Sequence, residues 1–277
     1  GPALLRGRVV VRQSDGEGLY LLLARDARRV RNWRLGSGTR PASQAPAVPP
    51  PVHAARLANA EIVFRTSSGK RLVTRLHEAR LAAPDPEKAT LVEATGSYND
   101  APLVARIDLG PIGLLREGRP MPARVRGQSG DTTLDFHGTA RDPLNVDGLE
   151  GRLSLRAPTP GPILQMAQAE LPIALDIALS GHAVRDHALW RVNAIEGSLF
   201  DAPFTGRLLE MREGAEGEPD AIAADLDFSR LDINRILAGP RDQGGDDDAD
   251  VPLVVLARPD PRLDLRLAAR ELAYARL

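Results

Sequence analysis

The chain has 277 residues, a net charge of −1 at pH 7, no cysteine and few aromatic residues, whereas 43% of its residues are hydrophobic. The absence of cysteine excludes disulfide scaffolds and cysteine-ligated metal sites, and the balanced charge argues against nucleic acid as a partner. The length is sufficient for one domain with a sizeable core.

The dominant hydrophobic period along the chain is two. Apolar and polar residues alternate at Ile62/Phe64, 103–109, Leu134/Phe136, Leu153/Leu155, 173–179, Trp190/Val192/Ala194, 222–228 and 263–267. Such alternation gives a strand one apolar and one polar face. The 25 glycines and 23 prolines supply turns between short strands. We therefore predict an all-β fold with minor short helices, built mainly from a long antiparallel-type sheet.

Helical patterns are short. We expect one turn at 111–116 and helices at 162–170 and 229–238, the last beginning at Ser229 and ending before Gly239-Pro240. Residues 36–51, 212–219 and 240–250 have the composition of flexible loops. The strand pattern resumes after each loop, so residues 1–277 are interpreted as one domain.

A short motif recurs in the chain. Residues 96–103 and 197–204 agree at five of eight positions, and residues 138–144 form a looser third copy. Each reads as the end of one strand, a turn and the return into the next. Turn motifs also recur by chance, but repeated hairpins favour a sheet extended by lateral repetition.

Candidate chemical sites are weak. His182 and His187 lie near Asp186, but residues 181–187 read as a solvated hairpin turn rather than a metal site. Residues 246–250 lack the spacing of a calcium loop and are interpreted as a flexible acidic segment. Motifs for serine nucleophiles, phosphate loops and dinucleotides are absent from the sequence. We expect no catalytic residue, no metal, no cofactor and no enzymatic activity.

The apolar strand face has two interpretations. It can form a closed sandwich core, or it can line a curved sheet that stays partly open. The scarcity of aromatic residues and of helical or second-sheet material favours the open sheet. An aliphatic lining suits acyl chains, which need dispersion contact and exclusion of water.

The chain from Leu91 onwards resembles the AsmA-like proteins of Gram-negative bacteria. The resemblance lies in the ordered motifs G-T-x-x-D-P at Gly138, L-P at Leu171 and W-x-V-x-x-x-x-G-S at Trp190. It extends to ATGSYNDAPL (94–103), LGPIGLL (109–115), LDFSRLDINRIL (226–237) and PDPRLDLRLAARELAYARL (259–277). No single motif is specific, but the series covers about two-thirds of the chain.

The resemblance implies a periplasmic protein held in the inner membrane by an N-terminal helix, with a long twisted sheet curled into a hydrophobic groove. It implies outer-membrane biogenesis and transfer of phospholipids between the inner and outer membranes, with phospholipid acyl chains, the inner membrane and envelope proteins as partners. The groove lining is expected to comprise Leu103, Ile107, Leu134, Phe136, Leu153, Leu175, Ile177, Trp190, Val192, Leu226, Phe228, Leu263 and Leu265.

No stretch of the sequence approaches the roughly 20 apolar residues of a membrane-spanning helix. The chain opens with Gly1-Pro2, the dipeptide that a common tag-removing protease leaves after cleavage, and ends in what resembles the start of another unit. We therefore expect it to be truncated at both ends. A scaffold that assists outer-membrane protein assembly and a purely structural β-domain are the alternative functions.

Overall fold

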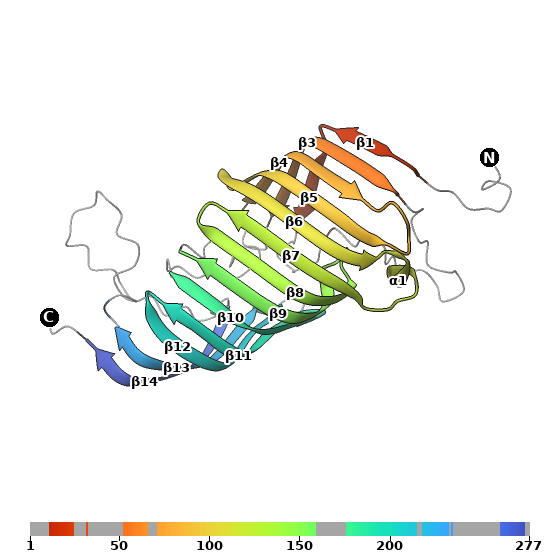
Figure 1. Cartoon of the computed structure of the whole chain (residues 1–277). Coiled ribbons are helices and arrows are strands. Elements are labelled where there is room, and N and C mark those ends of the chain that lie inside the picture. The colour runs from red at the N-terminus through yellow and green to blue at the C-terminus, as the bar shows by residue number, and fades with distance from the viewer. Residues whose placement is uncertain are drawn as a thin grey trace, which may run out of the picture.

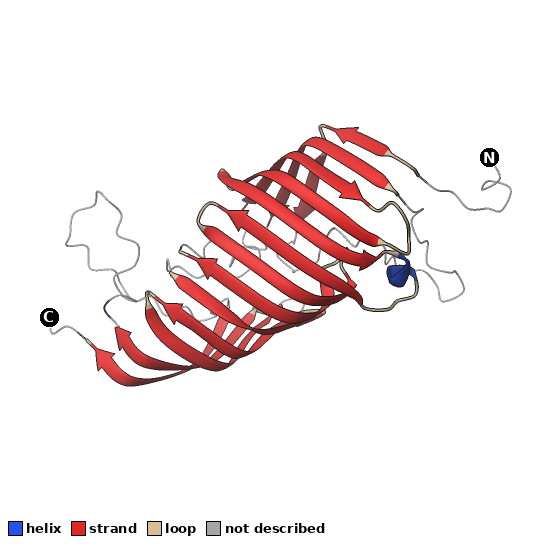
Figure 2. Cartoon of the chain, in the orientation of Figure 1, coloured by secondary structure: helices blue, strands red, loops and turns tan. Residues whose placement is uncertain are grey.

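The computed structural model describes residues 11–24, 32, 52–65, 71–158, 176–214, 218–232, 234 and 261–274. Its strands are β1 (Ser14–Glu17), β2 (Tyr20–Ala24), β3 (Ala54–Arg65), β4 (Arg71–Ala82), β5 (Ala89–Tyr98), β6 (Ala101–Pro111), β7 (Met121–Ser129), β8 (Thr132–Asp142), β9 (Asp147–Ala157), β10 (Ile177–Asp186), β11 (Leu189–Leu199), β12 (Ala202–Arg212), β13 (Ala221–Asp232) and β14 (Arg262–Ala273). A single turn of helix, α1 (Gly113–Arg116), accompanies them, and Figure 2 shows how strongly strand dominates.

All fourteen strands belong to one sheet. Strands β3 to β13 lie side by side in chain order and pair antiparallel with their neighbours, whereas β1 and β2 run parallel to β3 and β14 runs parallel to β13. Figure 1 shows β1 and β14 at opposite ends of the molecule, with the sheet curling so that parts of it lie behind the front strands. The predicted long, curved all-β sheet is confirmed, and the described strands form no second sheet that would close a sandwich.

The curvature has local causes within the strands. Register shifts occur between Leu76 and Glu78, between Ser180 and His182, and between Gly206 and Leu208. Such bulges bend a strand and increase its twist. They fall in mid-strand, so each affected strand turns part-way along its length and the sheet curls.

Small residues form a row across four neighbouring strands, β7 to β10. Ala123, Gly138, Gly151 and Ala183 are successive cross-strand partners on β7, β8, β9 and β10. A Cβ added to Gly138 would overlap the carbonyl oxygen of Glu150, and one added to Gly151 would lie 2.6 Å from the Cα of Gly138. The two glycines therefore let the backbones of β8 and β9 approach more closely than side chains allow.

The repeated motif corresponds to two equivalent hairpins. Asn99 and Asp100 connect β5 to β6 with φ angles of 43° and 69°, and Phe200 and Asp201 connect β11 to β12 with 48° and 64°. Positive φ at both central residues is the type I′ geometry that matches the twist of paired strands. In each hairpin the first turn residue donates its N–H to a carbonyl of the neighbouring chain segment: Asn99 to Val73 O of β4 at 2.8 Å, and Phe200 to Asp176 O, just before β10, at 2.8 Å.

Several local predictions are corrected. Ser229 to Asp232 continue strand β13 instead of beginning a helix, because Leu231 and Asp232 pair with Leu272 and Ala273 of β14. Only Asn234 has helical backbone among the described residues of that predicted helix. The turn expected at 181–187 is also wrong over most of its length, because Gly181 to Asp186 belong to β10. The helical turn at 111–116 is confirmed by α1.

Other predicted elements fall outside the described residues. These are the loop at 36–51, the loop at 240–250, which contains the acidic run at 246–250, and the helix at 162–170. Residues 173–175 of the strand expected at 173–179 also fall outside. In the expected loop at 212–219, Arg212 ends β12, and Glu213 and Gly214 have no regular structure. The flexibility of that loop stays a prediction.

Candidate functional site

The strand register defines one continuous apolar face. Direct cross-strand partners lie on the same side of a sheet, so the pairings trace this face from strand to strand. In β6 to β9 it runs through Ile107, Val125, Phe136 and Leu153, and in β12 to β14 through Phe204, Phe228 and Ala269. We call this the apolar face, and the opposite side the charged face.

The described members of the expected groove lining all lie on the apolar face. Strand register places there Leu103, Ile107, Leu134, Phe136, Leu153, Ile177, Trp190, Val192, Leu226, Phe228, Leu263 and Leu265. Leu175 lies outside the described residues. The strand register therefore brings these residues together on one side of the sheet. Whether the residues line a lipid path stays a prediction.

Burial along the apolar face is uneven. One cluster centres on Ile195, Phe204 and Phe228, and a second on Ala123, Phe136 and Ala140. Leu153 packs against both clusters and joins them. At the end of the sheet, by contrast, Leu263 and Leu265 of β14 are 52% and 51% exposed. The apolar face is thus packed in its middle and open at its β14 end.

The alternation fails at one point of β11. It predicted Trp190, Val192 and Ala194 on one face, but Ala194 is exposed and Ile195 is only 2% exposed. Ala194 has a φ of 49°, which shifts the alternation by one residue. Ile195 instead of Ala194 therefore joins the apolar face, opposite Gly206.

Large apolar residues missed by the alternation also lie on this face. Tyr98 and Met121 are buried there, and burial raises the pKa of the Tyr98 hydroxyl to about 12. Tyr98 ends its strand at the turn, and Met121 begins its strand after α1. Short alternating runs do not reach such terminal positions.

The charged face is covered by ion pairs between neighbouring strands. Arg106 contacts Glu93 at 2.8 Å and Asp108 at 2.9 Å, and Arg191 contacts Glu210 at 2.9 Å. The hydrogen bond from Arg106 holds the pKa of Asp108 below its ordinary value against the effect of desolvation. Exposed pairs of this kind are screened by solvent and contribute little stability, so the charged face mainly keeps this side of the sheet in water.

Three acidic residues of the charged face, Glu61, Glu93 and Asp135, lie apart from one another. Glu61 pairs with Arg75, Glu93 with Arg106, and Asp135 with Arg124. Each therefore has an arginine partner in a different part of the sheet.

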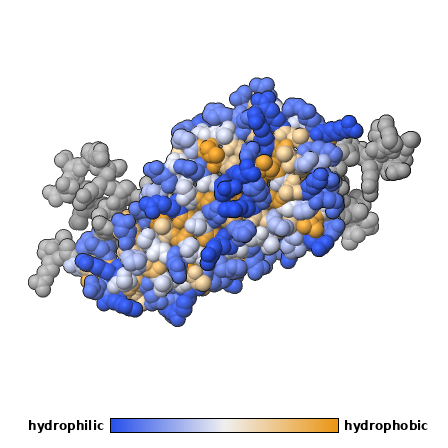
Figure 3. All heavy atoms as spheres, in the orientation of Figure 1, coloured by the Kyte–Doolittle hydropathy of each residue, from blue (hydrophilic) through white to orange (hydrophobic). Residues whose placement is uncertain are grey.

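Figure 3 shows one side of the molecule, where hydrophilic residues surround hydrophobic ones that run obliquely across the middle.

A buried ion pair lies at the margin of the apolar face, where β10 and β11 meet their connecting turn. Arg185 lies on the apolar face of β10 and contacts Glu213 at 3.3 Å, and both side chains are less than 10% exposed. Its guanidinium stacks over Trp190, 4.6 Å from the ring centroid. Trp190, expected as a simple apolar lining residue, is thus a platform for a buried cation.

A cavity of about 340 Å³ opens beside the β11–β12 turn. Its apolar wall comes from Leu199, Ala202 and Leu231, which also belong to the cluster around Phe228. Arg230 and Asp232 also line it. The cavity therefore combines apolar residues of the apolar face with charged side chains.

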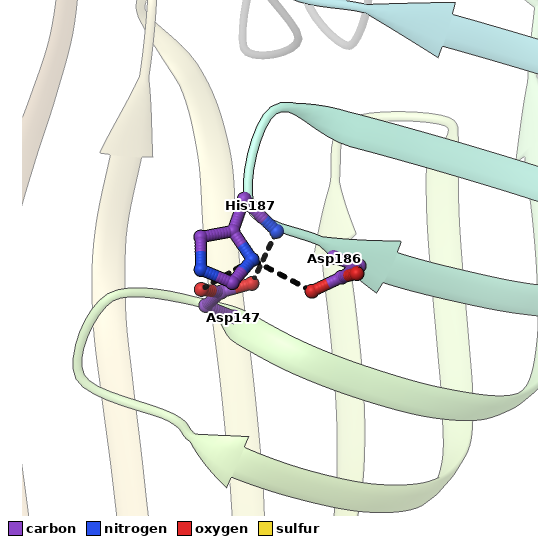
Figure 4. Close-up of side chains that lie close together, drawn as sticks. All are labelled: Asp147, Asp186 and His187. Carbon is purple, nitrogen blue, oxygen red and sulfur yellow. Dashed lines mark hydrogen bonds and ion pairs between the residues drawn. The ribbon is translucent and has the colours of Figure 1, made fainter.

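The one ligand-capable cluster among the described residues lies at the opposite end of β11 (Figure 4). Atoms of Asp147, Asp186 and His187 that could hold a metal lie within 4.8 Å of one another. The Asp147 carboxylate accepts the backbone N–H of His187 at 2.7 Å and of Gly148 at 2.8 Å, and His187 Nδ1 lies 2.7 Å from Asp186 Oδ1. These contacts tie the start of β9 to the β10–β11 turn. His182, the other histidine considered, faces away and approaches Glu150 at 3.6 Å.

This cluster has a defined electrostatic character. The hydrogen bond to Asp186, followed by the charge of Asp147, raises the pKa of the exposed His187 imidazole. Burial opposes ionisation of Asp147, but its bonds from the backbone N–H groups of His187 and Gly148 prevail and lower its pKa. Ionised Asp147 stabilises the folded protein at pH values above the ordinary aspartate pKa of about 4, and this stabilisation is lost as the pH falls through the lowered pKa of Asp147. Protonated His187 stabilises the folded protein at pH values below the ordinary histidine pKa of about 6.5, and this stabilisation is lost as the pH rises through the raised pKa of His187.

Replacing Asp186 with asparagine is therefore expected to lower the pKa of His187, because the imidazolium loses its main partner. The imidazole resonances of the folded protein, followed by NMR as a function of pH, measure this directly. Asp201→Asn, at the other end of β11, is the matched control and leaves the titration of His187 unchanged. An unaltered His187 titration in Asp186→Asn would show that the contact does not exist in solution.

Among the described residues, the structure contains no helix long and apolar enough to cross a membrane. Comparison with known proteins finds a stretch of 119 residues that is 29% identical to the AsmA family protein YhjG of Escherichia coli (strain K12). The match covers 42% of this chain and 17% of that protein, so the chain corresponds to a minor part of its relative. No family model matches the chain, and no solved structure matches it.

Proposed function

We propose that this chain is a non-enzymatic module of the Gram-negative cell envelope that shelters the acyl chains of phospholipids during transfer between the inner and outer membranes. The observation that carries the proposal is the continuous apolar face of a single curved sheet, opposed by a face of ion-paired side chains. Its aliphatic lining and the partial match to an AsmA family protein support the same function. The full-length protein would act in the periplasm, anchored to the inner membrane.

The physical mechanism is passive. Each buried methylene contributes about 0.8 kcal/mol, so ten methylenes supply about 8 kcal/mol before the cost of ordering the chain. That is the scale of micromolar affinity, so apolar contact alone can hold an acyl chain without a directional group. Headgroups stay in water at the open edge of the sheet, while the tails move along a face that offers no strongly preferred position.

Lipid capture tests this function. The purified protein, incubated with phosphatidylethanolamine–phosphatidylglycerol vesicles and re-isolated, is expected to carry phospholipid detectable by native mass spectrometry. Leu134→Asp, on the apolar face of β8, should lose most of this lipid. Thr133→Asp, the neighbouring residue on the charged face, should retain it. Circular dichroism establishes that both variants are folded.

If Leu134→Asp fails to fold, Leu265→Asp replaces it, because Leu265 lies on the same face and is half exposed. Absence of lipid from the unmodified protein would contradict the proposal. Equal lipid content in the apolar-face variant and the charged-face variant would also contradict it.

A further inference from the structure

The cavity beside the β11–β12 turn has an apolar wall that continues the apolar face. Its volume of about 340 Å³ lies within the range of small-molecule sites, roughly 300–1,000 Å³. Leu199, Ala202 and Leu231 line it, and all three also belong to the cluster around Phe228. An apolar chain that leaves the cavity on this side therefore passes directly onto the apolar face.

Charged side chains of both signs line the same cavity. They are Arg230, Asp201 and Asp232. Neither Arg230 nor Asp201 forms an ion pair with another described residue, although Glu271 is the register partner of Arg230 on β14. Asp232 Oδ1 accepts the backbone N–H of Asn234 at 3.0 Å. One cation and one carboxylate of the cavity are thus available to a ligand.

The charges at the other end of β11 are arranged differently. There Arg185 contacts Glu213 at 3.3 Å, both side chains are buried, and the guanidinium stacks over Trp190. This arginine is committed to partners within the protein. Of the two ends of β11, the one with the cavity is therefore the one that can receive a charged group of a ligand.

Phe200, which also lines the cavity, is unusual for its place in the turn. It has a φ of 48°, a conformation that is costly for a bulky side chain. The equivalent residue of the β5–β6 hairpin is Asn99, which tolerates a φ of 43° and accepts the backbone N–H of Val73 at 2.9 Å with its side-chain oxygen. Phenylalanine cannot make that bond, so its presence indicates a role as a wall of the cavity.

The combination of groups selects the chemistry of a ligand. An arginine guanidinium binds phosphate through paired hydrogen bonds, and carboxylates attract an ammonium group. A purely anionic headgroup would be attracted by Arg230 but repelled by Asp201 and Asp232. A headgroup with both a phosphate and a primary ammonium group meets complementary charge at each end. The apolar wall favours a ligand that also carries acyl chains.

We propose that this cavity binds the headgroup of a zwitterionic phospholipid of the phosphoethanolamine type, with its phosphate on Arg230 and its ammonium group at Asp201 and Asp232. The acyl chains then lie on the apolar face beyond Leu231. Arg230 and Asp201 are exposed, so the bound headgroup keeps its contact with water. This inference rests on the proposed function and names the class of lipid and the place where its headgroup binds.

Headgroup selection tests the proposal. The protein is incubated with vesicles of equal parts phosphatidylethanolamine and phosphatidylglycerol, re-isolated, and its lipid is identified by native mass spectrometry. The unmodified protein should carry at least about threefold more phosphatidylethanolamine than phosphatidylglycerol. Asp201→Asn with Asp232→Asn should abolish this preference, and asparagine suits the positive φ of Asp201. Asp100→Asn, at the equivalent position of the β5–β6 turn, is the matched control and should keep the preference.

Total lipid reports the proposed function, whereas lipid composition reports the headgroup site. Bound lipid with the composition of the vesicles, or a preference that survives in the Asp201→Asn, Asp232→Asn variant, would overturn the headgroup site alone. Absence of all lipid would overturn both proposals.

A soluble compound with the same charged groups separates the lipid from a free phosphate ester. Phosphoethanolamine, titrated into the lipid-free protein in a calorimeter, should bind at least about tenfold more weakly than the lipid, because it lacks acyl chains to contact the apolar face. Binding as strong as that of the lipid would assign the cavity to a soluble ligand and would overturn the proposal.

Discussion

Replacing Gly151 with alanine is expected to lower the free energy of unfolding by about 2–4 kcal/mol. The added Cβ would lie 2.6 Å from the Cα of Gly138 on the neighbouring strand and would also crowd the carbonyl group of His137. Both obstacles are backbone atoms, so relief requires β8 and β9 to move apart. Separation would disturb the cluster of Phe136 and Ala140 beside them.

Gly127→Ala is the matched control for this effect. Gly127 lies on the same apolar face of β7, but nothing lies within 4 Å of an added Cβ. Its replacement should change stability by less than about 0.5 kcal/mol, since most substitutions away from such contacts do so. Chemical denaturation of both variants makes the comparison. Equal stability would show that close approach of β8 and β9 is not required for the fold.

Replacing Arg185 with methionine is expected to destabilise the protein by about 3–5 kcal/mol, because the buried Glu213 carboxylate loses its contact with the Arg185 guanidinium. Methionine preserves much of the length and apolar contact of the arginine stem over Trp190. The loss should therefore reflect charge more than packing.

The double variant Arg185→Met with Glu213→Met supplies the control for this pair. It should recover most of the lost stability, because an apolar pair can replace a buried ion pair of similar volume. Denaturant unfolding of both single variants and the double variant completes the cycle. If the double variant lost as much stability as the two single variants combined, the two side chains would not act as a pair.

Much of the sheet can be predicted from period-two alternation because each strand has one side packed and one side in water. Alternation grouped Ile107, Leu134 and Leu226 with apolar neighbours for this reason, and strand register places all three on one face. The hairpins at Asn99 and Phe200 were recognisable because their sequences repeat. These features are local, and local sequence carries them.

The errors arise where pairing overrides local preference. Ser229 to Asp232 have a helix-like pattern, but β14 supplies backbone partners that extend β13 instead. The φ of Ala194 has no signature in its residue type, so the shift that brings Ile195 inward was unpredictable. Arg185 and Glu213 lie 28 residues apart and meet only through strand register.

We expect lipid to contact the apolar face of the sheet and not the charged face. Photo-crosslinking from Leu103 and Val104 distinguishes the two faces, since Leu103 lies on the apolar face of β6 and Val104 lies on the charged face. With a photoreactive residue at either position and phospholipid vesicles as the probe, we expect lipid adducts from position 103 and few or none from position 104. Equal labelling at both positions, or labelling mainly at position 104, would contradict the account.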